Sequence, residues 1–135
     1  MRLYMLDTNV ASAAIRGSAA LDARLGRLEP QQWCVSAITR AELRYGLALR
    51  PEATRLARLV DGFLAATTTL PWDEAAADAH GRLRAQLRQA GKPIGDFDEM
   101  IAGHALALGA VLVTDNIRHF QWVGGLVLEN WIRGS

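Results

Sequence analysis

The stretch PIGDFDEMIAGHALALGAVLVTDN, residues 93–116, contains the signals that decide the fold. Apolar side chains recur at helical spacing from about Phe97 to Leu108, and Gly109 then ends the helix. The apolar run at residues 110–114 has the length of a buried strand. A helix that leads directly into a buried strand is typical of α/β folds with a parallel sheet.

The same alternation of short apolar runs and helical spacing recurs through the rest of the chain. No internal repeat, low-complexity tract or linker divides it. The sequence therefore predicts a single domain over residues 1–135, with a three-layer α/β/α arrangement and a central, mostly parallel sheet of four or five strands. We expect the other strands at residues 2–6, 33–36, 67–70 and near 126–128, and the other helices at 8–16, 19 to about 28, 38–49, from Pro51 onward and 73–90.

Length and composition fit one cytoplasmic domain. The chain has 135 residues, half of them hydrophobic, which falls within the ~100 to 200 residues of a typical domain. Its longest apolar stretch, residues 105–113, is well short of the ~18 residues that a membrane-spanning helix needs. The single cysteine, Cys34, lies in an apolar run and cannot form an internal disulfide. We therefore expect a cytoplasmic protein with no membrane partner.

The charge balance does not by itself identify a nucleic-acid partner. The formal net charge is only +1, which gives no global basic field. All of the 15 basic residues except Lys92 are arginine, whose planar guanidinium matches phosphate oxygens. A GC-rich genome explains this arginine content better than selection for phosphate binding does.

Four acidic residues fall where strands end or helices begin. Asp7 follows the first strand, Asp115 follows the strand at 110–114, Glu42 lies in the second turn of a helix, and Asp98 lies at the start of another. In α/β folds, strand ends and helix beginnings share the carboxyl edge of the sheet, where ligands usually bind. We expect the four carboxylates to gather at this edge.

Each acid also has a purely structural interpretation. Asp7, with Thr8 and Asn9, could simply cap a helix; residues 39–42 match a capping box, and so do residues 96–99. The group of acids favours a functional interpretation, because converging anions raise one another's pKa unless a cation lies among them. Hard cations such as Mg²⁺ prefer carboxylate and water oxygens. A bound divalent ion can activate water and stabilise a phosphodiester under attack.

Other catalytic chemistries find less support in the sequence. The glycine-rich nucleotide fingerprints, H-E-x-x-H and C-x-x-C are all absent, which disfavours nucleotide and zinc chemistry. His80 and His104 lie within predicted helices, and His119 lies in a polar segment without an evident acidic partner. We expect these three histidines to have core or surface roles.

Three stretches of the chain, taken together, match one family. YMLDTNVAS (4–12), VSAITRAELRYGL (35–47) and GKPIGDFDEMIAGHALALGAVLVTDNIRHF (91–120) occur in this order, and GLVLENW follows near the end. In these motifs the chain resembles the VapC toxins of bacterial toxin–antitoxin pairs, which are PIN-domain ribonucleases. The resemblance extends over nearly the whole chain.

The resemblance implies a set of site residues. Asp7, Glu42 and Asp98 match the acidic metal-site positions, with Asp7 and Asp98 as direct ligands and Glu42 acting directly or through a metal-bound water. The chain departs from many PIN domains where a further acid follows the fourth strand, because this position is Asn116. The accessory positions are Thr8, Asn9, Asp96, Asp115 and Asn116, with Glu99 of similar rank.

The resemblance also implies an activity and partners. Such proteins cleave RNA endonucleolytically with Mg²⁺ or Mn²⁺ as cofactor, and similarity to enterobacterial VapC proteins suggests initiator tRNA as the substrate. We expect a homodimer, inhibition of translation, neutralisation by a VapB-type antitoxin, and contact with promoter DNA mainly through the antitoxin. Arg40, Arg44 and Arg118 are candidates for phosphate contact, although solvated helix faces explain each of them as well; Trp72, Trp122 and Trp131 fit core or dimer positions.

Two alternatives remain open from the sequence. A PIN-like RNA-binding or scaffolding protein without catalysis would share the fold, but the complete set of Asp7, Glu42 and Asp98 argues against it. A receiver-like signalling module also has acids along a parallel sheet. It requires an acid pair after the first strand and a lysine after a late strand, whereas Asp7 is single and Lys92 lies in a loop.

Overall fold

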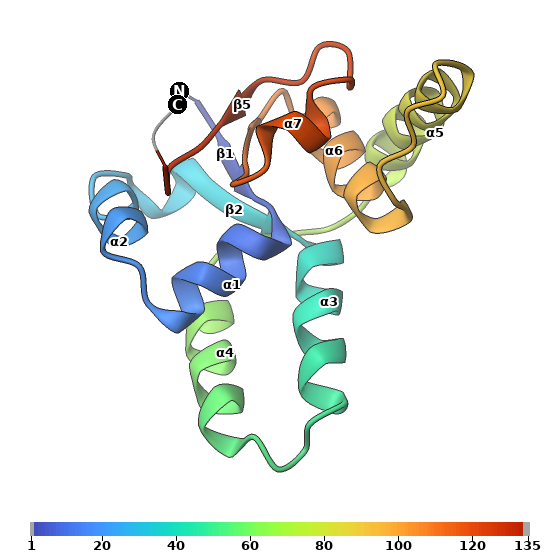
Figure 1. Cartoon of the computed structure of the whole chain (residues 1–135). Coiled ribbons are helices and arrows are strands. Elements are labelled where there is room, and N and C mark those ends of the chain that lie inside the picture. Colours follow the sequence, from blue (N-terminus) through green and yellow to red (C-terminus); the bar gives the residue numbers. More distant parts are fainter. Residues whose placement is uncertain (1, 134–135) are drawn as a thin grey trace.

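A five-stranded parallel sheet forms the centre of the computed structural model, which describes residues 2–133 (Figure 1). Every neighbouring pair of strands in this range is parallel, which confirms the predicted α/β class and its mostly parallel sheet. The strands are β1 (Tyr4–Leu6), β2 (Trp33–Ser36), β3 (Thr69–Leu70), β4 (Val111–Val113) and β5 (Leu128–Glu129), in the order β3-β2-β1-β4-β5.

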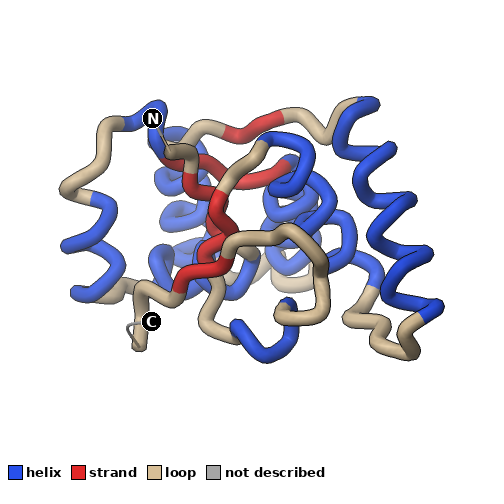
Figure 2. Tube along the Cα trace, turned by 90° about the horizontal axis from the view of Figure 1, so that it is seen from above, coloured by secondary structure: helices blue, strands red, loops and turns tan. Residues whose placement is uncertain are grey.

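Helices connect the strands and enclose the sheet, and Figure 2 shows the strands running between them. None of the helices in residues 2–133 is long and apolar enough to cross a membrane. The helices are α1 (Thr8–Arg16), α2 (Ala19–Leu25), the short 3₁₀ helix η1 (Pro30–Gln32), α3 (Ala37–Ala48), α4 (Thr54–Ala66), α5 (Glu74–Gln89), α6 (Asp96–Leu108) and α7 (Ile117–Phe120).

The central strands supply both faces of the core. Successive strand residues point to opposite sides of a sheet, so Met5 and Leu6 contribute to different buried clusters. The first cluster packs against α5 and α6, and the second packs against α1 to α4. The three layers therefore follow from strands that are apolar on both faces. The residues of the central strands in the first cluster are Met5, Cys34 and Leu112, and those in the second cluster are Leu6, Val35 and Val113.

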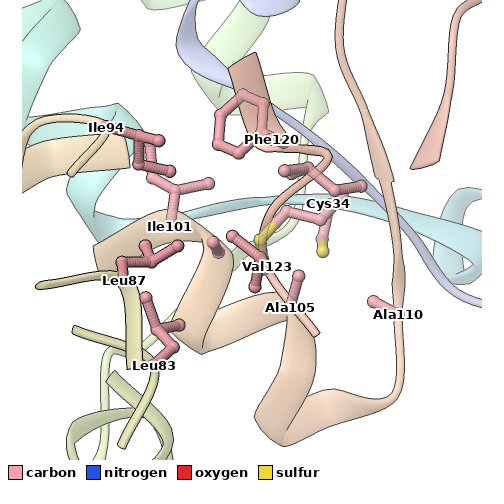
Figure 3. Close-up of a cluster of buried hydrophobic side chains, with 12 residues drawn as sticks. Cys34, Leu83, Leu87, Ile94, Ile101, Ala105, Ala110, Phe120 and Val123 are labelled. Carbon is pink, nitrogen blue, oxygen red and sulfur yellow. The ribbon is translucent and has the colours of Figure 1, made fainter. Parts of the chain in front are cut away.

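The first cluster fixes α6, which carries Asp98, against the sheet. Figure 3 shows Leu87 of α5, Ile101 of α6 and Phe120, the last residue of α7, gathered in this cluster. Cys34 belongs to the same cluster and is 1% exposed, and its burial raises the pKa of its thiol to about 12. Cys34, which lies in an apolar run of the sequence, is therefore a small buried hydrophobic residue.

Helices α5 and α6 approach each other unusually closely at one glycine. A Cβ atom placed on Gly103 would lie 2.7 Å from the Cα of His80, a separation that real Cβ atoms essentially never show. Only glycine therefore permits the observed spacing of these helices. His80 also packs edge-on against Trp72, with 5.5 Å between the ring centroids.

Several boundaries differ from the predictions. Helix α2 ends at Leu25 and not near residue 28, and β3 and β5 have only two residues each. Helix α4 begins at Thr54, because residues 51–53 form a turn and not the helical start expected at Pro51. The short α7 was not predicted, because four residues are too few to show helical periodicity.

The strand order reverses beside β1. The chain builds β1, β2 and β3 outward in one direction and then crosses back to place β4 on the other side of β1. Ligands of open α/β sheets bind at the carboxyl ends of the strands where the order reverses in this way. The order β3-β2-β1-β4-β5 also differs from the 2-1-3-4-5 order of receiver domains, which removes the receiver-like alternative.

Candidate metal centre

Asp7 lies at the reversal point of the sheet. It directly follows β1; its backbone N–H donates to the carbonyl of Val113 in β4 at 3.0 Å, and its side chain is almost completely buried. Its carboxylate accepts a hydrogen bond from the Val10 backbone N–H at 2.8 Å and so caps α1. The structural interpretation of Asp7 as a cap is thus correct, but it does not explain why a carboxylate is used at a buried position.

The charge on Asp7 is unfavourable in the absence of a cation. Its pKa is raised to about 6, chiefly by burial and to a smaller extent by the negative charges of Asp98 and Asp115, while hydrogen bonds from Thr114 and Val10 oppose the rise. Asp98 and Asp115 therefore lie close enough to Asp7 for their charges to act on it. The sequence prediction that these acids gather at one edge agrees with this placement.

Glu42 is held by α1 and not by its own helix. Helix α3 is capped by Ser36, so residues 39–42 do not form the capping box that their sequence suggested. Instead the Thr8 hydroxyl donates to the Glu42 carboxylate at 2.6 Å and lies 3.0 Å from the Thr39 hydroxyl. Burial raises the pKa of Glu42 and the charge of Asp98 adds to this, while the bond from Thr8 opposes it.

Asp98, in the first turn of α6, has a partner that the sequence did not reveal. The Nε2 atom of His119 lies 2.8 Å from Oδ2 of Asp98, and an ionised carboxylate can only accept, so the imidazole donates. The expectation that His119 lacks an acidic partner was therefore wrong. Helix α7 brings it there, and Asn116 caps that helix by accepting from the His119 backbone N–H at 3.3 Å. The one signal in the sequence for this short helix was the spacing of Asn116 and His119, which fits a capping residue and the N–H that it accepts from.

A buried hydrogen bond links the two helices that carry Glu42 and Asp98. The Nδ1 atom of His104, on α6, lies 2.8 Å from the hydroxyl of Ser36, which caps α3 by accepting from the backbone N–H of Ile38. Burial lowers the pKa of His104, so this imidazole favours its neutral form. His104 therefore has the core role that its helical position predicted, and it fixes the spacing of the helices beneath the site.

Asp115 and Asn116 border the site on its other side. The Asp115 carboxylate accepts from Nε of Arg133 at 2.9 Å and from Nδ2 of Asn130 at 3.1 Å. Asn9, Asp115 and Asn116 line a common polar cavity of about 560 Å³. Since Arg133 already balances its charge, Asp115 has less need of a metal than Asp7 has.

The remaining candidate residues have partners outside the acidic group. Arg84 of α5 pairs with Asp96 at 3.4 Å and lies 3.7 Å from the buried Glu99, so both acids point toward α5. Arg44 pairs with Asp61, and Arg40 donates to the Thr69 hydroxyl at 3.5 Å. Only Arg118, among the proposed phosphate contacts, lies beside a member of the site, because it adjoins His119 in α7.

The donor set fits a hard divalent cation. Carboxylates from the end of β1, from α3 and from α6 act on one another electrostatically, and carboxylate oxygens are the ligands that Mg²⁺ and Mn²⁺ prefer. Within residues 2–133, no three acidic, histidine or cysteine side chains are close enough to form a complete metal cage. Mg²⁺ usually keeps several waters and binds only one or two carboxylates directly, so an open group suits it.

Comparisons with known proteins place this chain in one family. The model of the PIN domain matches residues 4–125. The tRNA(fMet)-specific endonuclease VapC of Shigella flexneri is 39% identical over 131 residues, which cover 97% of this chain and 99% of that protein. The resemblance inferred from the sequence motifs is thereby confirmed.

Solved structures share the fold over the same range. The DNA-bound VapBC complex of Salmonella typhimurium contains a chain that is 37% identical, with a TM-score of 0.90 and coverage of 97% of this chain and 99% of that one. The VapBC2 complex of Rickettsia felis, bound to a promoter DNA fragment, has a chain that is 34% identical, with a TM-score of 0.90 and coverage of 96% and 98%.

Proposed function

The chain belongs to the PIN-domain family and, within it, to the VapC ribonucleases, and from this membership we propose that it hydrolyses RNA with Mg²⁺ or Mn²⁺ held by Asp7, Glu42 and Asp98. The observation that carries the proposal is the buried carboxylate of Asp7, whose pKa is raised by burial and by the neighbouring acids. A cation bound at this position relieves the repulsion between the carboxylates, and loss of the cation leaves their negative charges unbalanced.

The residues divide the work between them. Asp7 and Asp98 bind the metal directly, and Glu42, oriented by Thr8, contributes directly or through a metal-bound water. When bound, the ion lowers the pKa of the attacking water and stabilises the charge that builds on the phosphodiester. His119 orients Asp98 through the bond to its Oδ2 atom, and Thr8, Asn9, Asp115 and Asn116 support the edge of the site.

Initiator tRNA is the proposed substrate. The Shigella flexneri relative is named for its action on tRNA(fMet), and the similarity spans nearly all of both chains. Cleavage of this tRNA, which leaves 5′-phosphate and 3′-hydroxyl ends, blocks the initiation of translation. This loss of translation in the bacterial cytoplasm accounts for a toxin that inhibits growth.

A VapB-type antitoxin is the proposed partner. The Salmonella typhimurium and Rickettsia felis structures are VapBC complexes bound to DNA, which supports a toxin–antitoxin complex that binds DNA. In this complex the antitoxin is proposed to make most of the promoter contact. A groove of about 380 Å³ runs from Thr8 and Glu42 along leucine side chains of α3 and α4, and it suits a peptide that brings a basic side chain to the acids. The toxin within this complex is proposed to be a homodimer.

The test compares purified initiator tRNA with elongator methionine tRNA. Antitoxin-free chain is incubated with each tRNA in Mg²⁺, Mn²⁺ or EDTA, and the product ends are sequenced. We expect one metal-dependent cut in the initiator tRNA and none in EDTA. Equal cutting of both tRNAs would contradict the substrate, whereas cutting in EDTA would contradict the metal. Binding of the tRNA without cleavage would favour the scaffolding alternative.

A further inference from the structure

A second cleft adjoins the acidic group on the side of α7. Its volume is about 270 Å³, and it is lined by the loop at residues 91–94 and by Arg118, His119 and Trp122. We call it the Trp122 cleft. His119 also donates to Asp98 across 2.8 Å, so the same side chain borders both the cleft and the proposed metal site. Whatever occupies the cleft therefore lies next to the proposed metal site.

Trp122 presents an aromatic surface in this cleft. Its side chain is 48% exposed, whereas that of Trp131 is 4% exposed. Trp131 therefore has the predicted core position, and Trp122 does not lie in the core. The ammonium of Lys92 lies over one face of the Trp122 ring, 4.6 Å from its centre, in a cation–π contact. An accessible indole beside a cation is the arrangement on which unpaired bases stack in single-stranded nucleic-acid sites.

The charge of the cleft is positive. Lys92 and Arg118 line it, and no acidic residue among residues 2–133 does. Neither cation forms an ion pair with a carboxylate within the part of the chain that the structure describes, unlike Arg44, Arg84 and Arg133. These two side chains can therefore meet phosphate oxygens without first breaking an internal ion pair.

We propose that the Trp122 cleft binds an unpaired nucleotide of the RNA substrate beside the scissile bond. The base stacks on the indole of Trp122, and Lys92 and Arg118 contact the flanking phosphates. This inference rests on the proposed ribonuclease function and names the form of RNA that the site takes. Because a base in a duplex is already stacked on its neighbours, the cleft selects single-stranded loops over paired RNA.

Binding is measured apart from catalysis, in a chain that carries Asp7→Asn. The probe is a fluorescein-labelled RNA hairpin with an unpaired loop, compared with a fully paired duplex of the same length. We expect Trp122→Leu to weaken hairpin binding about tenfold and to leave duplex binding unchanged, because stacking on an aromatic side chain is lost. Trp122→Phe keeps an aromatic ring and should stay within about threefold of the parent.

The phosphate contact is tested by salt dependence. Lys92→Gln should lower the slope of log Kd against log salt by about one, as loss of one phosphate contact requires. Arg55→Gln is the matched control, since Arg55 is exposed on α4 and the substitution removes the same charge. It should leave both the affinity for the hairpin and the slope unchanged.

The outcomes separate this inference from the proposed function. If folded Trp122→Leu binds the hairpin with unchanged affinity, the proposal that the Trp122 cleft binds a nucleotide is overturned. It is also overturned if this variant loses affinity for an antitoxin peptide but not for RNA. An unchanged KM of Trp122→Leu in a background that still cuts RNA also overturns the cleft and leaves the nuclease standing. If the hairpin requires Trp122 for binding but the wild-type chain cuts no RNA in Mn²⁺, the cleft stands and the proposed catalysis fails.

Discussion

Asp7 combines two roles that place opposite demands on its charge. As the cap of α1 it accepts a backbone hydrogen bond, which favours the ionised form, but it is only 3% exposed and lies within reach of two other acids. The net effect is a pKa of about 6 instead of 3.8. At neutral pH the protein therefore holds a charge that costs stability until a cation balances it.

This balance predicts a pH-dependent effect of Asp7→Asn on stability. Since the folded state binds this proton more tightly than the unfolded state, the free energy of unfolding of the metal-free wild type falls as pH rises from about 4 to about 6. Asparagine still caps the helix and removes the charge. Thermal and urea unfolding should show Asp7→Asn more stable than wild type above pH 6, by at most about 3 kcal/mol, and equal to it near pH 4. A wild type that is the more stable of the two at pH 7.5 would contradict the account.

Asp98 and Asp115 should differ in their importance for activity. Asp115 is already balanced by Arg133 and Asn130, whereas Asp98 is held only by the His119 imidazole among the described residues. We expect Asp98→Asn to remove detectable RNA cleavage and Asp115→Asn to reduce kcat by a smaller factor. The two purified variants are compared at equal concentration in saturating Mn²⁺. The reverse order would show that Asp115 is the true ligand.

His119 should act on metal affinity through Asp98. Residues that orient a metal-bound side chain typically contribute about 10- to 100-fold to affinity, so His119→Ala should weaken Mn²⁺ binding by this factor. Isothermal titration measures it directly. His80→Ala provides a control, since His80 packs beside Trp72 and its Nε2 atom has no hydrogen-bond partner among residues 2–133. Equal Mn²⁺ affinity of His119→Ala and wild type would remove His119 from the site.

The helices and strands could be predicted wherever the pattern was long enough to show a period. α1 and β2 have the predicted bounds, α5 is shorter by one residue at each end, and α6 begins one residue earlier than predicted. β5 was expected near residues 126–128 and lies at 128–129, whereas the four residues of α7 are too few for periodicity to identify. His119 lies on α7, so its role was missed for the same physical reason.

The contact between α5 and α6 predicts opposite effects for two glycine substitutions. Gly103→Ala should destabilise the fold by about 1–3 kcal/mol, because the new methyl group would overlap His80 and force the helices apart. Gly81→Ala, within α5, meets nothing within 4 Å and should stabilise it by about 0.5–1 kcal/mol. Urea unfolding of both variants measures the difference. Equal stability of the two would show that α5 and α6 do not pack as described.

The arrangement of the whole molecule gathers residues that are far apart in the sequence. The sequence placed the acids at the carboxyl edge, because each follows a strand or begins a helix, but it did not reveal the strand order. Periodicity reports which face of a strand is buried and not which strand lies next to it. The order puts β4 directly beside β1, so Asp7 and Asp115 become neighbours while Asp96 turns toward Arg84.

The central claim is that these carboxylates hold a metal that cleaves RNA. The most direct test incubates total bacterial RNA with antitoxin-free wild type and with Asp7→Asn, each in Mg²⁺, Mn²⁺ and EDTA, and maps the ends by sequencing. We predict discrete cuts by the wild type in either metal, none in EDTA and none with folded Asp7→Asn. Equal cleavage by wild type and Asp7→Asn, or no cleavage by folded wild type in either metal, would contradict the claim.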